Sequence, residues 1–234
     1  MAIRNIIFDL GGVLLDIDLH HCMRQMQALG IDLDALKKQN LASAAKENSC
    51  NAVMGEGLVA TGATHLYQIG GISTEEFLGG IRHLCRPGTT PQQVLEAWNT
   101  CCIAIPQYRL NKIKELKARG YRIYMLSNTN EAHWQKIVEK CFGGQAVVDE
   151  LFDHTFLSQK MHMAKPNDDI YLKVLEDIGA SADECLFLDD SSQNVEAAAA
   201  LGFHTIHADT SKTQNGMVVA PPSTDWTTTI ESFL

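Results

Sequence analysis

Short apolar runs alternate with longer amphipathic segments along most of this chain. The first run, Ile3–Phe8, is rich in isoleucine and ends in three consecutive apolar residues. Such a run is typical of a strand that is buried on both faces of a sheet. It stops at Asp9, and Gly11 and Gly12 then allow the backbone to turn sharply. The pattern therefore predicts a buried first strand that ends in a carboxylate and a tight turn.

The segment from about residue 19 to 101 has helical signals and no convincing strand. Capping residues and stop residues mark most of its helices. The expected helices run from an Asp18 cap to Leu29, from Asp32 or Asp34 to about Lys46, onward from the capping box Ser73–Glu76, and from the pair Thr90 and Pro91 to Trp98. This segment is predicted to be a separate helical unit inserted after the first strand.

Strands and helices alternate again after residue 101. Strands are expected over residues 121–126, 152–157, 185–188 and 203–207, and helices over 105–118, 131–141, 168–178 and up to 201. Alternation of this kind implies parallel strands joined by right-handed crossovers. The predicted fold class is α/β, a Rossmann-like doubly wound parallel sheet with an inserted helical cap. The core is assigned to 1–17 and 102–234 and the cap to 18–101, and the last residues are expected to form a short docking helix.

Composition is that of an ordinary globular protein. The 234 residues are 45% hydrophobic and 20% charged, which is enough for one α/β domain and a smaller insertion. The formal net charge is -9, and no run of Lys and Arg interrupts the acidic balance. An acidic surface repels nucleic-acid phosphates and anionic lipids, so neither is an expected partner.

The cysteines and the apolar runs bear on location. The 7 cysteines are irregularly spaced, contain no C-x-x-C pair and show no zinc-ligand pattern, which favours reduced thiols. The first apolar run is too short for a signal-peptide core, and no apolar stretch reaches the roughly 18 residues that a membrane helix needs. We therefore expect a cytoplasmic protein.

Polar residues follow four of the expected strands, and they suit phosphoryl transfer. They are Asp9, Ser127 with Asn128, the Lys165 loop and the pair Asp189-Asp190. The carboxyl ends of parallel strands meet at one edge of a sheet, where ligands bind. Phosphoryl transfer needs an in-line nucleophile and positive charge around the phosphoryl oxygens, and adjacent carboxylates favour a bound Mg²⁺.

These four segments resemble the four conserved motifs of the haloacid dehalogenase (HAD) superfamily. They are FDLGGVL from Phe8, LSNTN from Leu126, Lys165-Pro166, and LFLDD from Leu186 with Asn194 behind it. They occur in the expected order and span nearly the whole chain. Their spelling is most similar to the branch that contains bacterial α-D-glucose-1-phosphate phosphatases, and phosphatase domains of epoxide hydrolases are further relatives.

The resemblance implies a role for each matched residue. Asp9 would be the nucleophile and, with the Gly11 backbone carbonyl and Asp190, would bind Mg²⁺. Asp189 would help from outside the metal's direct ligands. Ser127, Asn128 and Lys165 would hold the phosphoryl group. The substrate would be a small phosphorylated metabolite. Independently of the resemblance, the chain is expected to be a monomer or homodimer.

One position departs from the pattern of most phosphatases in this superfamily. They carry a second Asp two residues after the nucleophile as general acid and base, and this chain has Gly11. Loss of the general acid typically lowers the rate by a factor on the order of 10²–10⁴. Another group near the cap hinge would have to donate the proton, or the leaving group would have to be acidic, as in a sugar 1-phosphate. The candidates for the substitute acid are Asp16, Asp18, His20 and His21.

Two other functions remain open at this level. A 2-haloacid dehalogenase also uses an Asp nucleophile, but it needs no metal, and the pair Asp189-Asp190 would then oppose an anionic substrate. A phosphate-binding protein with weak catalysis would be the consequence if Gly11 had abolished efficient turnover. A phosphomutase is less favoured, because it depends strongly on the missing acid.

Overall fold

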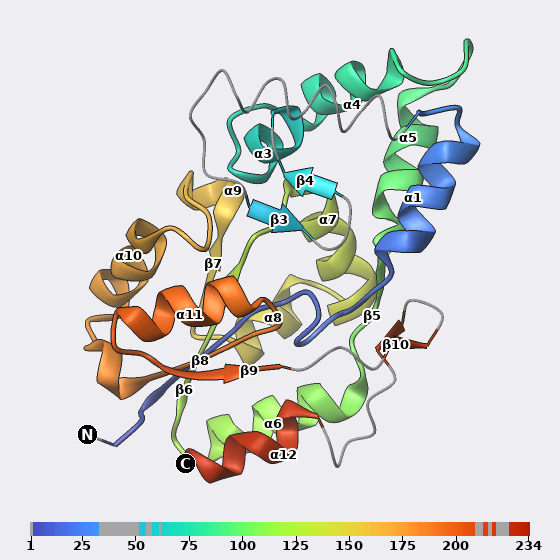
Figure 1. Ribbon diagram of the computed structural model, residues 1–234. Coiled ribbons are helices and arrows are strands. Elements are labelled where there is room, and N and C mark those ends of the chain that lie inside the picture. The colour runs from blue at the N-terminus through green and yellow to red at the C-terminus, as the bar shows by residue number, and fades with distance from the viewer. Residues whose placement is uncertain are drawn as a thin grey trace.

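The computed structural model describes residues 2–32, 52–54, 58–60, 62–208, 213–214, 217–218 and 225–234 (Figure 1). Apart from Asp32 itself, the helix expected from Asp32 or Asp34 to Lys46 lies outside the described residues.

A 5-stranded parallel sheet forms the centre of the molecule. Its strands in spatial order are β7 (His154–Leu157), β6 (Arg122–Ser127), β1 (Asn5–Phe8), β8 (Cys185–Asp189) and β9 (His204–His207). Every neighbouring pair is parallel. The first strand therefore lies in the middle, with crossovers to both sides. This confirms the predicted doubly wound α/β fold.

Helices cover both faces of this sheet (Figure 1). On one face, Ile6 and Phe8 share a buried cluster with residues of α6 (Gln107–Ala118), α8 (Gln145–Leu151) and α12 (Trp226–Thr229). On the other, Ile7 packs with residues of α10 (Asp168–Ile178) and α11 (Ser192–Ala200). Successive residues of a strand point to opposite faces, so the apolar run of β1 fills both layers.

The inserted segment contains four described helices, and three of them begin at their predicted caps. Those three are α1 (Leu19–Ala28), α4 (Thr74–Arg82) and α5 (Pro91–Trp98), whereas α3 (Ala63–Gln68) was not predicted and has no side-chain cap. The Asp18 side chain accepts a hydrogen bond from the His21 backbone N–H at 2.7 Å. Capping boxes at Ser73 and Thr90 begin α4 and α5. Since the cap satisfies backbone N–H groups that a helix start leaves unpaired, these helix starts were readable from sequence.

The expectation that this segment lacks strands is wrong. Strands β3 (Ala52–Met54) and β4 (Leu58–Ala60) pair antiparallel. Each strand has only 3 residues. A pattern that alternates every second residue cannot be recognised over so short a run.

Two short strands join the inserted segment to the sheet. Strand β2 (Asp16–Ile17) pairs antiparallel with β5 (Cys102–Ala104), which follows the 3₁₀ turn η1 (Asn99–Cys101). The chain thus leaves the core through β2 and returns to it through β5, and these two strands lie side by side. Residues of both strands lie near the edge of the sheet where β1 ends.

Several connections in the core carry structure that the patterns did not predict. Helix α7 (Glu131–Lys136) continues as a π-helical segment, η2 (Ile137–Phe142), and α8 follows it. The remaining short elements are α9 (Ser158–Met161), η3 (Ala182–Glu184), β10 (Thr213–Gln214) and β11 (Met217–Val218).

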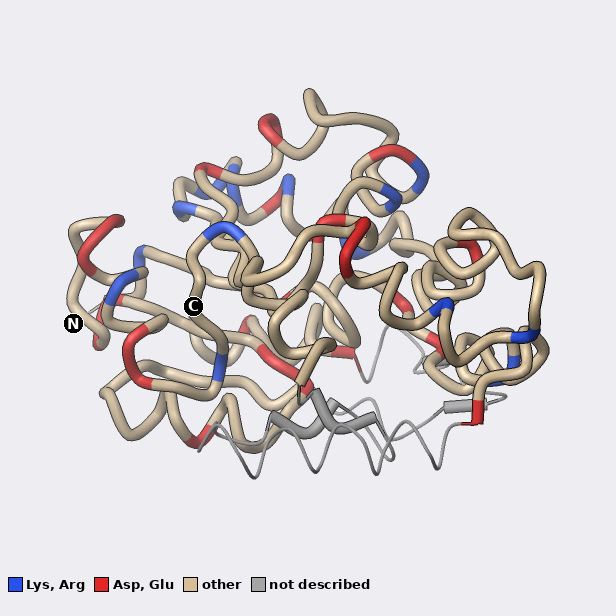
Figure 2. The backbone as a smooth tube through the Cα atoms, turned by 90° about the horizontal axis from the view of Figure 1, so that it is seen from above, with Lys and Arg blue, Asp and Glu red and all other residues tan. Residues whose placement is uncertain are grey.

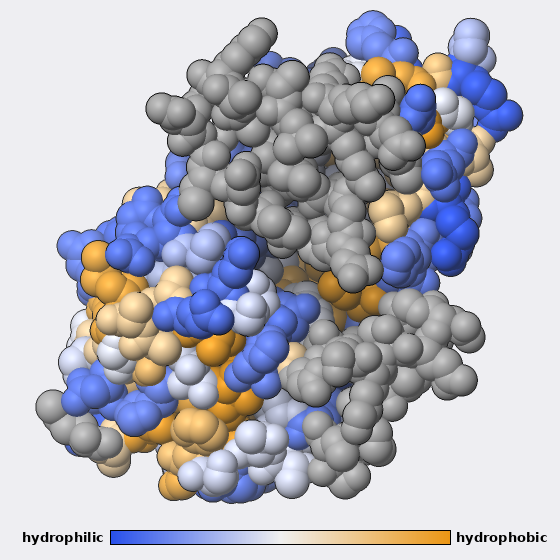
Figure 3. Space-filling model, in the orientation of Figure 1, coloured by the Kyte–Doolittle hydropathy of each residue, from blue (hydrophilic) through white to orange (hydrophobic). Residues whose placement is uncertain are grey.

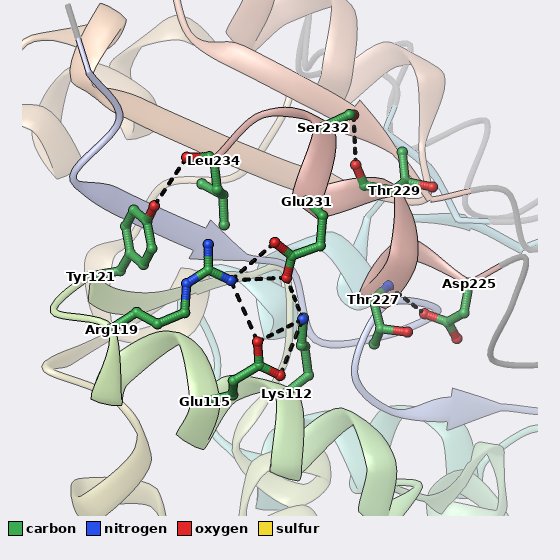
Figure 4. A network of polar contacts seen from close by, with 10 residues as sticks. All are labelled: Lys112, Glu115, Arg119, Tyr121, Asp225, Thr227, Thr229, Glu231, Ser232 and Leu234. Carbon is green, nitrogen blue, oxygen red and sulfur yellow. Dashed lines mark hydrogen bonds and ion pairs between the residues drawn. The ribbon is translucent and has the colours of Figure 1, made fainter.

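The C-terminal residues dock on α6, as expected for a short docking helix (Figure 4). Helix α12 is followed by the 3₁₀ turn η5 (Ile230–Ser232). Glu231 pairs with Lys112 and, at 2.9 Å, with Arg119. A buried ion pair adds to this anchor, because the Arg109 guanidinium lies 3.0 Å from the Asp225 carboxylate.

Charged residues of both signs are interspersed along the described backbone (Figure 2). Hydrophobic side chains reach the surface between the part of the molecule that carries α1 and the part that carries α11 (Figure 3). Among the described residues, no helix combines the length and the apolar character that crossing a membrane requires.

Candidate active site

Three charged residues from distant parts of the chain meet at the carboxyl edge of the sheet. Asp9 follows β1, Asp189 ends β8, and Lys165 lies in the loop before α10. The Lys165 ammonium lies 2.7 Å from Asp9 Oδ1 and 2.6 Å from Asp189 Oδ2. It also donates to the Leu126 carbonyl at the end of β6, at 2.9 Å. The arrangement brings the first, third and fourth polar segments into direct contact.

The site holds more negative than positive charge. Oxygens of Asp9, Asp189 and Asp190 all lie within 4.8 Å of one another, and Lys165 is the ammonium among them. Burial raises the pKa of Asp9 to about 8 and that of Asp190 to about 6, with further repulsion from Asp189. Burial by itself would lower the pKa of Lys165, but Asp189 and Asp9 raise it above its usual value. Hard oxygen donors with an unbalanced negative charge fit a divalent cation such as Mg²⁺.

The two adjacent aspartates have different surroundings. Asp189 is fully buried, and its Oδ1 accepts from the Ser191 backbone N–H at 2.8 Å and from Asn194 Nδ2 at 2.9 Å. Its Oδ2 accepts from Lys165, so both oxygens are engaged. Asp190 instead lines the pocket in front of Asp9. The geometry suits Asp190 for direct contact with a cation and Asp189 for holding Lys165.

Gly12 is required by the position of Asp190. Its φ is 75°, in the region that favours glycine, and a Cβ there would lie 2.3 Å from Asp190 Oδ2. Gly11 differs, since a Cβ there would make only ordinary contacts with the Ile17 side chain, at 3.8 and 3.9 Å. The space beside Gly11 can therefore accept a side chain, whereas the space beside Gly12 cannot.

The Asn128 side chain positions Lys165. Its Nδ2 donates to the Lys165 carbonyl at 2.9 Å, and its Oδ1 accepts from the Lys165 backbone N–H at 3.0 Å. The Lys165-Pro166 peptide bond that follows is cis. Since both polar atoms of the side chain bind the Lys165 backbone, the backbone N–H of Asn128 is the better candidate to hold a phosphoryl oxygen. Ser127, buried at the end of β6, lines the same pocket.

The structure does not bring the proposed substitute acids to this pocket. Asp16 forms an ion pair with Arg109 at 2.8 Å, and Asp18 caps α1. Neither of them, nor His20 or His21, is among the described residues that line the pocket. The cause is the alternation of β2, in which Ile17 faces the pocket and its neighbour Asp16 points the other way.

His133 lines the pocket and was missed from sequence. It lies in the first turn of α7, stacked on Trp98 with ring centroids 5.1 Å apart. Asn130 caps α7 through Oδ1, which leaves its Nδ2 facing His133 Nδ1 at 3.1 Å. Nδ1 must then accept, so Nε2 carries the proton and donates to the Trp98 carbonyl at 3.1 Å. Burial lowers the pKa of His133 to about 4, so the ring is neutral near pH 7.

A second compact group of metal-ligand types adjoins the first. Donor atoms of Cys101, Cys102 and His133 lie within 4.8 Å of one another. A metal would need the unprotonated Nε2 of His133. The hydrogen bond that Nδ1 accepts from Asn130 instead places the ring proton on Nε2. The tautomer therefore disfavours a metal on His133, and the group is better described as part of the pocket wall.

The pocket between these elements has a volume of about 460 Å³. Its inner end carries Asp9, Gly11, Ser127, Asn128, Lys165 and Asp190. Its outer wall comes from β2 and β5, here called the hinge strands, from the start of α1, and from α7 with η2. The site can thus hold a phosphoryl group at the sheet edge and a leaving group against the hinge.

A Rossmann-like sheet with an Asp nucleophile candidate at the end of its central strand defines a class of hydrolase. Residues 3–202 match the family model described as haloacid dehalogenase-like hydrolase. The chain therefore belongs to the haloacid dehalogenase-like hydrolases.

Relatives of the chain include phosphatases. It is 29% identical over 207 residues to the D-ribitol-5-phosphate phosphatase of Bacteroides thetaiotaomicron, covering 87% of this chain and 90% of the relative. A shorter match, 32% over 108 residues, is to the sesquiterpene phosphatase astK of Aspergillus oryzae, covering 46% of this chain and 53% of the relative.

Solved structures of the same family give a similar result. A HAD family enzyme from Bacteroides thetaiotaomicron in complex with magnesium and inorganic phosphate is 31% identical, with a TM-score of 0.71, covering 89% of this chain and 95% of that one. An L-2-haloacid dehalogenase shares the fold with a TM-score of 0.62 at 15% identity, covering 100% of this chain and 99% of that one.

Proposed function

We propose that this hydrolase is a Mg²⁺-dependent phosphatase that cleaves a small phosphate monoester through a phosphoaspartate on Asp9. One observation carries the proposal. The Asp9 carboxylate opens into the pocket, and the Lys165 ammonium, 2.7 Å away, is itself fixed by Asp189. The phosphatase relatives and the magnesium and phosphate in a related structure support it.

The residues at the inner end fit a bound Mg²⁺. Asp9 and Asp190 would supply carboxylate oxygens and Gly11 its backbone carbonyl, while Asp189 would act through Lys165. Bound there, Mg²⁺ would offset the carboxylate charge and favour negative charge on the phosphoryl oxygens.

The side chains of this chain then divide the work. Asp9 attacks phosphorus in line, the bond from phosphorus to the leaving oxygen breaks, and the phosphoryl group is transferred to the carboxylate. Lys165, Ser127 and the Asn128 backbone N–H hold the phosphoryl oxygens. A water then attacks the same phosphorus, the bond to Asp9 breaks, and inorganic phosphate leaves. Lys165 favours the ionised and nucleophilic form of Asp9 throughout.

The leaving oxygen has no proton donor at Gly11. None of the substitute acids considered from sequence is among the described residues that line the pocket. A leaving group that is a stable anion, or that takes a proton from water, fits this part of the site best. A sugar 1-phosphate meets this condition, in agreement with the glucose-1-phosphate branch that the motifs resemble. The polyol phosphate named for the ribitol-5-phosphate phosphatase has a poorer leaving group.

Dehalogenation is the second candidate function. The dehalogenase structures are 15 to 20% identical and show the fold alone. The three carboxylates in one site argue against this function, because a halide displacement on an anionic substrate gains nothing from them. A phosphate-binding protein with weak catalysis remains the third candidate, because of Gly11.

Other aspects of the function stay predictions. A cytoplasmic location and no nucleic-acid or membrane partner are expected from charge, cysteine usage and the short apolar runs. A monomer or homodimer is expected as well. The division into a core of 1–17 and 102–234 and a cap of 18–101 is a proposal too. Closure of that cap would exclude water during transfer to Asp9.

The test is turnover with and without Mg²⁺. Purified protein should release phosphate from a panel of monoesters with Mg²⁺ present, and excess chelator should abolish the release. Asp9→Asn should lower kcat by at least about 10³, whereas the surface control Asp169→Asn should leave it unchanged. Chelator-resistant halide release from a 2-haloacid would instead establish dehalogenation, and phosphate binding without turnover would establish a binding protein.

A further inference from the structure

The outer wall of the pocket is apolar. Its described residues come from the turn after β1, from β2, from α1, from the η1–β5 junction and from η2. They are Leu15, Ile17, Leu19, Cys101, Cys102 and Ile137. This wall is continuous with the inner end that holds Asp9, so a leaving group attached to the phosphoryl group would lie against it.

Cys101 and His133, beside this wall, already have hydrogen-bond partners. Cys101 donates from Sγ to the Trp98 carbonyl at 3.5 Å. Both ring nitrogens of His133 are used, by Asn130 and by Trp98. A hydroxyl group of a sugar that faced these described residues would lose water and find no partner, which is costly in a buried place.

Ile17 places methyl groups beside the position that lacks the acid. Its Cγ2 and Cδ1 would lie 3.8 and 3.9 Å from a Cβ on Gly11. The leaving oxygen therefore meets an apolar surface and no proton donor from position 11. The polar residues Ser192 and Gln193, at the start of α11, line another part of the same pocket.

We propose that the leaving group of the substrate is an apolar ring on an acidic hydroxyl, which makes aryl phosphates the substrate class. The proposal rests on the phosphatase activity proposed above. An aryl ring gains from burial against Ile17 and its neighbours, and its phenolate leaves without prior protonation. The apolar ring suits the apolar wall, and the acidic hydroxyl suits the lack of a proton donor at position 11. A sugar 1-phosphate has only the second of these properties.

The first test separates ring burial from acidity. Phenyl phosphate and 2-naphthyl phosphate release phenols of nearly equal acidity, and the second has a larger apolar ring. With Mg²⁺, we expect kcat/KM for 2-naphthyl phosphate to be about fivefold higher, as expected for one additional buried ring edge. Glucose 1-phosphate and ribitol 5-phosphate should lie at least about tenfold below phenyl phosphate.

Variants locate the effect in the wall. Ile17→Asn should reduce the preference for naphthyl over phenyl to within about twofold, mainly through KM. The milder Cys102→Ser should reduce it in the same direction if Ile17→Asn does not fold. Leu172→Asn, an equivalent change at a side chain that is 52% exposed on α10, should leave the ratio unchanged.

The outcomes are distinct. Equal rates for the two aryl esters, or a preference for glucose 1-phosphate, would overturn the substrate class and leave the phosphatase intact. A preference that survives in Ile17→Asn would show that another part of the molecule provides it, and would also overturn the proposal. Failure to hydrolyse any monoester in Mg²⁺ would remove the phosphatase activity on which it rests.

Discussion

Restoring a carboxylate at position 11 should change the rate according to the leaving group. A side chain fits there, because a Cβ on Gly11 would make only ordinary contacts with Ile17. The backbone of Gly11 has no positive φ among those recorded for the described glycines, so an L residue needs no strained conformation. Gly11→Asp should therefore fold like the parent protein and add a proton donor near the leaving oxygen.

The expected magnitude follows from what a general acid contributes. A positioned acid supplies on the order of 10²–10⁴ in rate when the leaving group needs protonation. An alkyl phosphate such as ribitol 5-phosphate should gain about 10² or more in kcat/KM. An aryl phosphate should gain less than about tenfold, because its phenolate leaves unassisted.

The assay is phosphate release at saturating Mg²⁺ for a series of esters with graded leaving-group acidity. The slope of log kcat/KM against leaving-group pKa should be shallower for Gly11→Asp than for the parent. Gly11→Asn is the matched control, since it fills the same space without donating the same proton. An equal gain for alkyl and aryl esters, or the same gain in Gly11→Asn, would refute the reasoning.

Three further changes have defined outcomes. Gly12→Ala should lower activity at least about tenfold and raise the Mg²⁺ concentration needed for half-maximal rate. The new Cβ would lie 2.3 Å from Asp190 Oδ2 and would push that carboxylate out of place. Arg109→Met should cost about 3–5 kcal/mol in urea unfolding, because it leaves the buried Asp225 carboxylate unpaired. The pKa of His133 is lowered to about 4 by burial, so the unfolded chain binds its proton more tightly and stability falls as the pH drops from about 6.5 towards 4. His133→Gln should remove about 1–2 kcal/mol of that loss between pH 7 and pH 5 in urea unfolding.

Each of these changes has a control. Gly11→Ala should retain most of the activity that Gly12→Ala loses, and equal losses would contradict the steric argument. Lys114→Met removes a cation from a surface ion pair and should change stability by no more than about 0.5 kcal/mol. A pH profile of unfolding that is the same with and without His133 would show that this ring is not the group that titrates.

The sequence by itself determined the order of the five core strands and the residues expected at the inner end of the site. Short apolar runs in the sequence indicate the buried strands. Asp9 and the pair Asp189-Asp190 directly follow such runs, and Lys165 lies in a loop between two of them. Parallel strands place their carboxyl ends together, so the meeting of these charges could be predicted without coordinates. Helix starts at Asp18 and Ser73 were readable for the same reason, since a cap acts within a few residues of itself.

Only the tertiary structure decided which residues form the outer wall of the pocket and whether the proposed substitute acids face it. Asp16 and Ile17 are neighbours in sequence, but the pairing of β2 with β5 turns one to Arg109 and the other to the pocket. Cys101, Cys102 and His133 meet through packing of segments about thirty residues apart, which no local pattern encodes. Local patterns report the environment of a residue along its own element. Which distant side chain completes a site depends on register and packing between elements, and these exist only in the folded chain.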